Sequence, residues 1–575
     1  MRPWTNKTLG LGILGLFLVA LGKSLCFIWP MLFQHIIQKG LALTSTSRSF
    51  EVWKDTSNFP PIFLKIYMFN WTNPEEFRER GKKPVFKQVG PYVFREVRQK
   101  DNITFHHENK TVSYLQRRFW YFDDELSNGS LSDVITNLDV VTVSAAHAVR
   151  YWEVNLQQTL SFLLTSTSRK IYISKTVDEL LFSGYPDVLF TMSKGLIEDM
   201  PPYSRFGWFY LRNGTSDLDG HFNMETGEDD ISQLGILRKW NYKDTMKFYK
   251  SPCNIIEGSA GEFWPPGRTK DDITLFSVEL CRPITYEYEG TISHYGIDGY
   301  RYTIDKKTLG NSTRRRYPHE KMMFLEPTTT TEDFFSADHS GEITGSTEPT
   351  LLFNRSSKNT ADDYSDEDPD VVNMGRCYCN GECTPSGLIN VTACRFGAPV
   401  FISLPHFYKT DPSVLETVVG LNPNEREHSF SITLEPTTGI PLEVSARLQI
   451  NVLAQSSKLV KLYKDVPKTY FPMFWFSLQV QVTEDMAYNL KTLLALPVVM
   501  LCTGVILAVV GLCLIGLVAL LYLKKKQHAP TTDGATEKTV DDPSDKKTEM
   551  VYMDKVSGTE DANVRSDRCL YAKLY

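Results

Sequence analysis

Two long apolar runs, one near each end of the 575-residue chain, constrain its fold more than any other feature. The first covers residues 9–33 and the second covers residues 493–523. A helix of about 20 apolar residues crosses the hydrocarbon core of a bilayer, and both runs are long enough. Lys23 interrupts the first run, but a lysine near one end of a span can extend to the interface. The sequence therefore predicts two transmembrane helices that flank one large domain.

The first run also has to be compared with a cleaved signal peptide. It follows a short basic start, Arg2 and Lys7, as signal peptides do. Its apolar stretch, however, exceeds the usual about 7–15 residues, and no clear small-x-small cleavage site follows it. We therefore interpret the first run as an uncleaved anchor.

Basic residues outside the two runs predict the orientation. Residues 1–8 contain Arg2 and Lys7, and residues 524–575 begin with three consecutive lysines. The positive-inside rule places both termini in the cytosol and residues 34–492 outside the cell or in a lumen. We expect a protein of the plasma membrane, with the endosomal or lysosomal membrane as the alternative.

Glycosylation sequons and cysteines agree with this orientation. Eight N-x-S/T sequons fall in the middle region, at Asn70, Asn102, Asn109, Asn128, Asn213, Asn311, Asn354 and Asn390. The same region contains six cysteines, at positions 253, 281, 377, 379, 383 and 394. An even number of cysteines in an oxidising compartment predicts three disulfides. A zinc site on the last four would need reduced thiolates, so we expect no metal there.

Strand-like alternation dominates the middle region. The clearest case is residues 442–452, where apolar and polar side chains alternate, and residues 430–434 alternate in the same way. The short stretch between these segments, residues 436–439, predicts a hairpin loop. Helical spacing appears instead between residues 131 and 200, where Trp152, Leu156, Leu160 and Leu163 recur at helix-face intervals. The sequence predicts an α+β fold: a sheet-rich body that carries a compact helical head.

Two polar segments differ from the rest. Residues 327–370 are rich in Thr, Ser, Asp and Glu, a composition that cannot bury enough apolar surface to fold. This acidic insert is either a solvated spacer or a site for cations or a basic ligand. The tail ends with Tyr571 and Leu574 in a Tyr-x-x-apolar pattern. Endocytic adaptors bind such patterns, although a pattern this short also occurs by accident.

Several function classes find no support in the sequence. A net charge of −6 without a basic stripe gives no reason to expect nucleic-acid binding. Gly10, Gly12 and Gly15 match a dinucleotide-binding pattern, but they lie inside a predicted membrane helix, where glycines instead let helices approach closely. No zinc-protease, nucleophile-elbow or P-loop pattern occurs. We expect neither an enzyme nor a cofactor.

Four short segments resemble the signatures of one family. They are residues 88–92 (QVGPY), 403–407 (SLPHF), 420–424 (GLNPN) and 447–452 (RLQINV). In this order and with this topology, they resemble the class B scavenger receptors, a family that includes the fatty-acid translocase, the high-density-lipoprotein receptor and the lysosomal integral membrane protein type. The similarity covers roughly residues 8–520, and the acidic insert is longer than the family norm.

The resemblance implies a large antiparallel β-barrel with a hydrophobic tunnel and a helical head distal from the membrane. It also implies the disulfide pairs Cys253–Cys377, Cys281–Cys394 and Cys379–Cys383. Candidate tunnel residues are Leu448 and Ile450, which belong to the cleanest alternating strand; the alternative is that they fill an ordinary sheet core. Candidate ligand-binding residues of the head are Trp152, Leu156, Leu160, Arg169 and Lys170. The family's head often carries lysines at its apex, whereas the nearest cations here are displaced to Arg169 and Lys170.

Two functions follow as hypotheses. The first is a cell-surface receptor that captures lipids, lipoproteins or lipid-bearing particles and either moves lipid through the tunnel or internalises the ligand. The second is a lysosomal or endosomal sorting receptor that binds a protein cargo through its helical head. Lipid content of the purified protein distinguishes the two.

Overall fold

The computed structural model describes residues 6–57, 61–79, 81–192, 203–311, 314–316, 371–379 and 383–527. Contacts divide the chain into two units, residues 1–37 with 483–575 and residues 38–482. The acidic insert 327–370, the sequon at Asn354 and the tail signal at Tyr571 and Leu574 lie outside the described residues.

The first unit contains two long helices, α1 (Asn6–Leu41) and α12 (Glu484–Gln527). Their apolar windows have mean hydropathies of 2.2 and 3.0, and both helices are long and apolar enough to cross a membrane. Each helix extends beyond the apolar run that the sequence shows, because helical hydrogen bonding continues into the polar residues at its ends.

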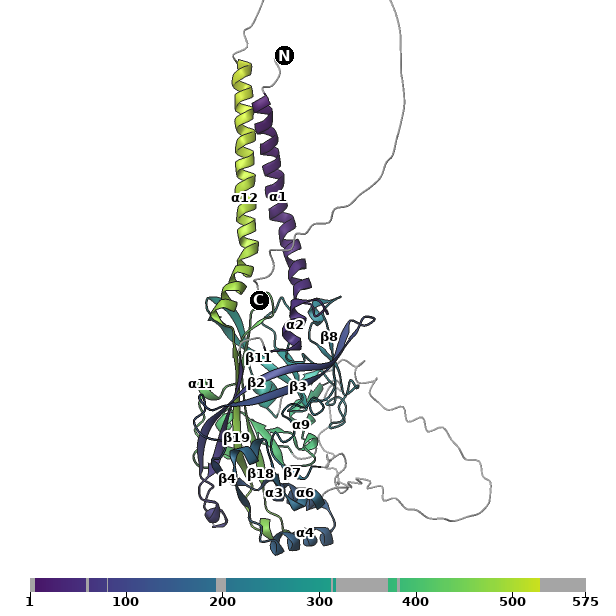
Figure 1. The fold of residues 1–575 in the computed structure, drawn as a ribbon, viewed down its shortest axis with the longest axis vertical. Coiled ribbons are helices and arrows are strands. Elements are labelled where there is room, and N and C mark those ends of the chain that lie inside the picture. Colours follow the sequence, from purple (N-terminus) through teal and green to yellow (C-terminus); the bar gives the residue numbers. More distant parts are fainter. Residues whose placement is uncertain are drawn as a thin grey trace, which may run out of the picture. The chain divides into compact units, whose positions relative to one another are not determined.

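Glycines bring α1 and α12 close together, and the two helices run side by side in Figure 1. A Cβ atom added to Gly15 would lie 2.9 Å from the carbonyl oxygen of Gly511, and one added to Gly22 would meet the carbonyl oxygen of Gly504 even more closely. A side chain at either position would push the helices apart. Gly10, by contrast, has nothing within 4 Å of an added Cβ.

The second unit is built on a thirteen-stranded sheet whose pairs are antiparallel. Eleven strands follow one path, in the order β10 (Ile273–Ser277), β11 (Arg282–His294), β12 (Ile297–Thr303), β17 (Ser431–Leu434), β18 (Pro441–Ala454), β19 (Thr469–Gln481), β1 (Ile62–Trp71), β2 (Phe86–His106), β3 (Thr111–Asp123), β8 (Phe222–Glu225) and β9 (Leu237–Trp240). β16 (Val400–Ser403) pairs with β18, and β15 (Ile389–Asn390) pairs with β16.

A short segment, residues 258–260, nearly closes this sheet into a barrel. On one side, the N–H of Leu237 in β9 donates to the carbonyl of Gly258 over 2.9 Å. On the other side, the N–H of Ser259 donates to Thr274 of β10, and the N–H of Phe276 donates back to Ser259, each over 2.9 Å. The α+β class and the antiparallel barrel that the resemblance implies are therefore confirmed.

The alternating strand β18 is covered on both faces. Its apolar side chains are on one face, as the alternation predicts, and Leu448 and Ile450 are half-buried there. The polar side chains of the other face are also inaccessible to water: Gln449 and Asn451 are fully buried. The Nε2 of Gln449 donates to the Oδ1 of Asn451 over 2.7 Å, and the Nδ2 of Asn451 donates to the hydroxyl of Ser403 over 3.0 Å. Hydrogen bonds between side chains thus replace the lost hydration.

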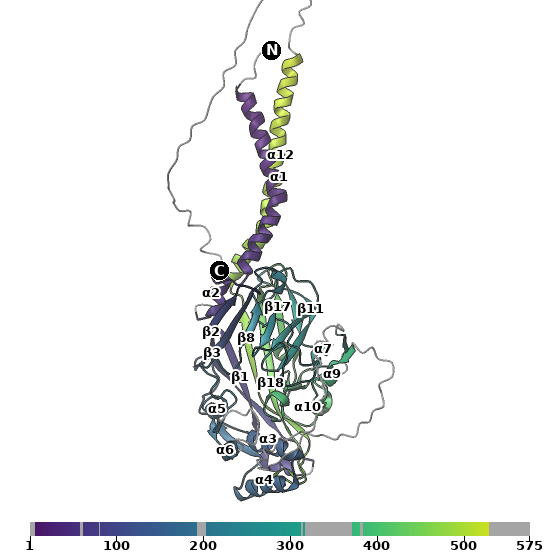
Figure 2. The ribbon, with the colours of Figure 1, turned by 90° about the vertical axis from the view of Figure 1, so that its right-hand side faces the viewer.

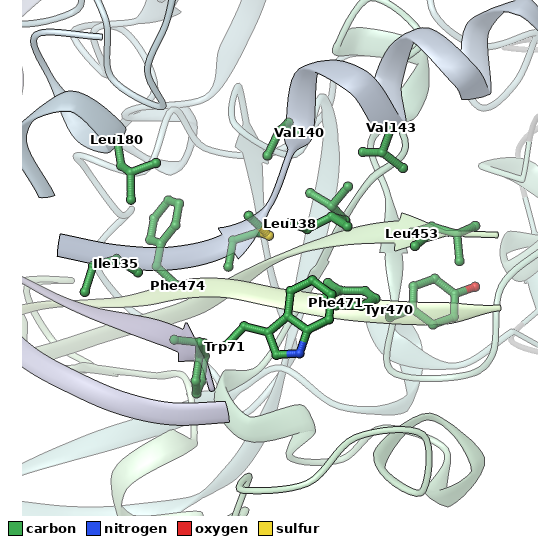
Figure 3. Close-up of a cluster of buried hydrophobic side chains, with 14 of the residues drawn as sticks. Trp71, Ile135, Leu138, Val140, Val143, Leu180, Leu453, Tyr470, Phe471 and Phe474 are labelled. Carbon is green, nitrogen blue, oxygen red and sulfur yellow. The ribbon is translucent and has the colours of Figure 1, made fainter. Parts of the chain in front are cut away.

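A large apolar core joins the sheet to the head. In Figure 3, Phe471 and Phe474 of β19 lie with Trp71 of β1 against side chains of β4 (Val134–Leu138) and α3 (Val140–Ala148). The rings of Trp71 and Phe471 meet edge to face at 4.9 Å. Because these aromatic rings are almost fully buried, the head and the long strands share one core.

The head is mixed rather than wholly helical. Its helices are α3, α4 (Val154–Ser166), α5 (Val177–Leu181) and α6 (Val188–Met192), which gather at one end of the long strands (Figure 2). Between residues 131 and 200, however, β4 pairs with β5 (Tyr172–Thr176). The predicted helix face is also partly wrong: α4 begins after Glu153, so Trp152 lies before the helix, and Leu156 is 49% exposed while Leu164 is buried.

Three disulfides tie the loops of the second unit together. They join Cys253 to Cys377, Cys281 to Cys394, and Cys379 to Cys383, the pairs that the resemblance implies. The first two close loops of 124 and 113 residues. These sulfurs are consequently not available as metal ligands.

Candidate functional site

A cavity of about 580 Å³ lies within the second unit and is the candidate site. One wall is apolar and comes from β17, β18 and β19. Its side chains include Phe430, Ile432, Val444, Ala446, Leu448, Ile450, Phe474, Phe476 and Leu478. Leu448 and Ile450 also pack against buried core residues, so their position agrees with both interpretations that the sequence left open. Contact between these two residues and a ligand stays a prediction.

The facing wall is charged, because alternate residues of β2 and β3 point into the same interior. Glu96 and Arg98 of β2 lie opposite Trp120 and Arg118 of β3 in the sheet register. Arg98 binds the carboxylate of Glu96 at 2.6 Å, and the indole N–H of Trp120 donates to the same carboxylate over 2.8 Å. Burial raises the pKa of Glu96, but Arg98 and Arg118 outweigh it, so that the pKa stays below its ordinary value.

Two further ion-pair groups complete the charged wall. Arg118 binds Asp219 at 3.0 Å and Glu279 at 2.9 Å, and Arg212 binds Asp219 at 2.6 Å. Deeper along β2, Lys100 pairs with Glu262, although only Glu262 lines the cavity. Burial lowers the pKa of Lys100 to about 8, with Glu262 acting in the opposite direction. The cavity is therefore amphipathic, with fixed charges facing a hydrocarbon surface.

Sequence reasoning missed this charged wall. Glu96, Arg98 and Lys100 alternate along β2, a pattern that normally indicates a solvated strand face. The available signal was that β3 continues the polar alternation with Gln116 and Arg118, so two neighbouring strands carry polar or charged side chains on matching faces. In a barrel, matching faces of neighbouring strands share an interior.

Arg169 and Lys170 of the head are both engaged in ion pairs, but only Arg169 is shielded from solvent and Lys170 remains exposed. Arg169 binds Asp139 at 3.3 Å and Asp187 at 2.6 Å, and both carboxylates are buried. Lys170 binds Glu75 at 2.9 Å. Leu160 is partly buried against the core, whereas Leu156 stays exposed. The described outer surface of α4 is instead uncharged, with exposed polar side chains beside exposed apolar ones such as Phe162, which is 75% exposed.

The four signature segments meet behind the apolar wall, around His406. The backbone N–H of His406 donates to Gln449 over 2.6 Å, and its Nε2 lies 2.6 Å from the Oε1 of Gln88. The N–H of Asn422 donates to its Nδ1 over 3.0 Å. Burial lowers the pKa of His406 to about 3, with His428 adding to the shift, so the ring is neutral at physiological pH. Only the segment 447–452 lines the cavity, through Leu448 and Ile450, and the other three segments support the wall from behind.

Comparison with known proteins gives this architecture a family. The model of the CD36 family matches residues 13–522. The chain belongs to the CD36 family. It is 34% identical to Protein peste of Drosophila melanogaster over 508 residues, covering 87% of this chain and 80% of the relative. It is 32% identical to scavenger receptor class B member 1 of Rattus norvegicus, covering 81% and 80%. A human relative, lysosome membrane protein 2, is 28% identical, covering 80% and 82%.

Membership of the CD36 family confirms the resemblance seen in the four segments and, together with the two candidate spans, makes this a membrane protein. Among the sequons, the asparagines at 102, 109, 128, 213 and 311 are exposed, and those at 70 and 390 are half-buried. Asn213 accepts the N–H of Trp120 over 3.0 Å and donates to its carbonyl over 3.1 Å, which fixes its side chain against β3. Use of each sequon stays a prediction.

Proposed function

We propose that this CD36-family protein is a lipid or lipoprotein receptor of the plasma or lysosomal membrane, with both termini in the cytosol. The observation that carries the proposal is the cavity with its continuous apolar wall. Its volume of about 580 Å³ is within the range of about 300–1,000 Å³ that small-molecule sites occupy. Each methylene group buried against the wall stabilises a bound chain by about 0.8 kcal/mol.

We assign capture of the lipid or lipoprotein to the head, and accommodation of the lipid chain to the cavity. The uncharged outer surface of α4 around Leu156 and Phe162 suits an apolar or zwitterionic lipid surface, since Arg169 is held in buried ion pairs and the exposed Lys170 is paired with Glu75. The relatives named as scavenger receptors support the same assignment. A receptor of this kind performs no chemistry on its ligand.

Lipid extraction of the purified full-length protein, followed by mass spectrometry, tests the proposal. We expect lipid at near-stoichiometric amounts, and we expect Ile450→Trp to reduce it. A protein without lipid that instead retains a protein cargo through the head would favour the second hypothesis, a lysosomal sorting receptor. One relative, lysosome membrane protein 2, is named for the lysosomal membrane.

We further propose that endocytic adaptors bind Tyr571 and Leu574. Individual side chains of an extended peptide fill separate pockets on the adaptor that binds it. Tyr571→Ala therefore leaves binding of labelled ligand at 4 °C unchanged, lowers uptake on warming and raises the surface pool. Uptake at the parental rate would show that the pattern is accidental.

A further inference from the structure

Two arginines of the cavity lining have no carboxylate partner among the described residues, and Arg395 is one of them. Arg395 follows Cys394, and its Nη2 donates to the backbone carbonyl of Glu279 over 2.6 Å. Among the described residues, no carboxylate oxygen lies within 4.0 Å of its guanidinium, whereas Arg98, Arg118 and Arg212 all have one.

The other lining arginine without a carboxylate is accommodated differently. Arg205 donates three hydrogen bonds to two backbone carbonyls, those of Ser183 and Gly184, at 2.7–3.2 Å. Arg395 makes a single bond of this kind, so most of its five N–H donors remain for another acceptor.

Arg395 is half-buried, and a charge that is withdrawn from water without a counter-charge is costly. Burial lowers the pKa of Arg395 to about 10, and the nearby Arg212 adds to this effect. The guanidinium is still charged at physiological pH. The closest acidic groups, Glu279 and Asp219, already bind Arg118 and Arg212, so they do not neutralise it.

The backbone holds Arg395 in a fixed position. On one side, Cys394 is joined to Cys281 by a disulfide. On the other side, Phe396 has a φ of 55°, and the N–H of Gly397 donates to Thr392 over 3.1 Å. A donor held in place loses little conformational entropy when it binds a ligand.

We propose that Arg395 binds the anionic head group of an amphiphile, a carboxylate or a phosphate, whose hydrocarbon chain lies along the apolar wall of β17–β19. The planar guanidinium matches the two oxygens of either head group. A neutral ester, alcohol or sterol leaves the charge of Arg395 unpaired. This inference rests on the proposed lipid-binding function and adds the charge of the ligand to it.

Equilibrium binding to the full-length protein in detergent tests the inference with three probes of equal chain length: palmitate, hexadecyl phosphate and hexadecanol. The wild-type protein should bind at least one anion about tenfold more tightly than the alcohol. Which anion binds more tightly distinguishes a carboxylate from a phosphate ligand. Equal affinity for all three probes overturns the inference while leaving the proposed function intact; binding of none contradicts the proposed function itself.

Substitutions test whether Arg395 causes the preference for anionic probes. Arg395→Gln should lose the about tenfold preference for the anion and bind hexadecanol as before. Arg238→Gln is the matched control, because Arg238 binds Glu225 at 2.7 Å and does not line the cavity. An unchanged preference in Arg395→Gln overturns the assignment. If that variant does not fold, Arg395→Lys keeps the charge but loses the planar fork, and a weakened preference in it supports the assignment.

Discussion

At the scale of single residues, the cavity combines two kinds of side chain that usually exclude each other. Half-buried aliphatic and aromatic side chains of β17–β19 face the paired ions of β2 and β3. Each ion pair survives burial because hydrogen bonds and neighbouring charges satisfy it, as Trp120 does for Glu96. The ion pairs of β2 and β3 can therefore line the interior without adding an unpaired charge to it.

The position of Ile450 in the wall leads to the first prediction. A tryptophan at this half-buried position can occupy cavity space, so Ile450→Trp should lower lipid content and uptake with little loss of stability. The control is Val452→Trp, two residues along the same strand but fully buried, which should overpack and destabilise by about 1–3 kcal/mol. Lipid mass spectrometry and thermal melting compare the two variants. Equal melting losses would show that Ile450 fills an ordinary core.

The lowered pKa of Glu279 leads to a prediction about the stability of the fold at low pH. Burial opposes its ionised form, but Arg118 and Arg212 outweigh burial and lower its pKa from 4.5 to about 2. A carboxyl whose pKa is lower in the folded than in the unfolded state stabilises the fold above about pH 4.5, and this stabilisation is lost as the pH falls towards about 2. Urea titrations of the full-length protein should show the free energy of unfolding falling across this window. Glu279→Gln should reduce the slope, and an unchanged slope would contradict the assignment.

At the scale of elements, the sequence predicted the positions of strands better than it predicted which faces of those strands are buried. Alternation located β17 and β18 and the hairpin between them, because apolar period-two patterns report a buried face directly. It did not show that Gln449 and Asn451 are buried too, or that the charges of β2 point inward. Both outcomes depend on what covers the second face of the sheet, which local periodicity does not record.

The head shows the same limit for helices. Its existence followed from helical spacing, but α4 starts later than the spacing of Trp152, Leu156 and Leu160 suggests. The ion pairs of Arg169 and Lys170 join residues distant in sequence, Asp139 and Glu75 among them, and no local pattern indicates such partners.

The glycines of α1 and α12 lead to a prediction at this scale. Gly22→Leu should separate the two helices and lower the fraction of protein that reaches the cell surface, because the added side chain meets the backbone of α12. Gly10→Leu is the matched control, since nothing lies within 4 Å of its added Cβ. Surface biotinylation compares the two variants. Equal delivery would mean that close packing of these helices is dispensable.

At the scale of the whole molecule, the disulfides stabilise the ectodomain to unequal degrees. In the chain-entropy model, the loop closed by Cys253–Cys377 contributes about 5 kcal/mol, whereas the short loop closed by Cys379–Cys383 contributes about 2 kcal/mol. The difference of about 3 kcal/mol is a large fraction of the typical stability of a domain, which is about 5–15 kcal/mol.

Paired serine substitutions test this difference without leaving free thiols. Cys253→Ser/Cys377→Ser should be retained in the secretory pathway, and Cys379→Ser/Cys383→Ser should mature more fully. Glycan processing on gels and surface biotinylation measure both variants. Normal delivery of the first variant would count against a stabilising role for that pair.

The short segment at residues 258–260 affects how readily neighbouring copies of the protein can pair through their sheet edges. A curled sheet that does not meet itself leaves two margins whose peptide groups can recruit a strand from another molecule. Here Gly258 and Ser259 lie between the margins and use the backbone groups of Leu237, Thr274 and Phe276. The two edge strands therefore offer fewer free peptide groups to a strand from a neighbouring copy of the protein.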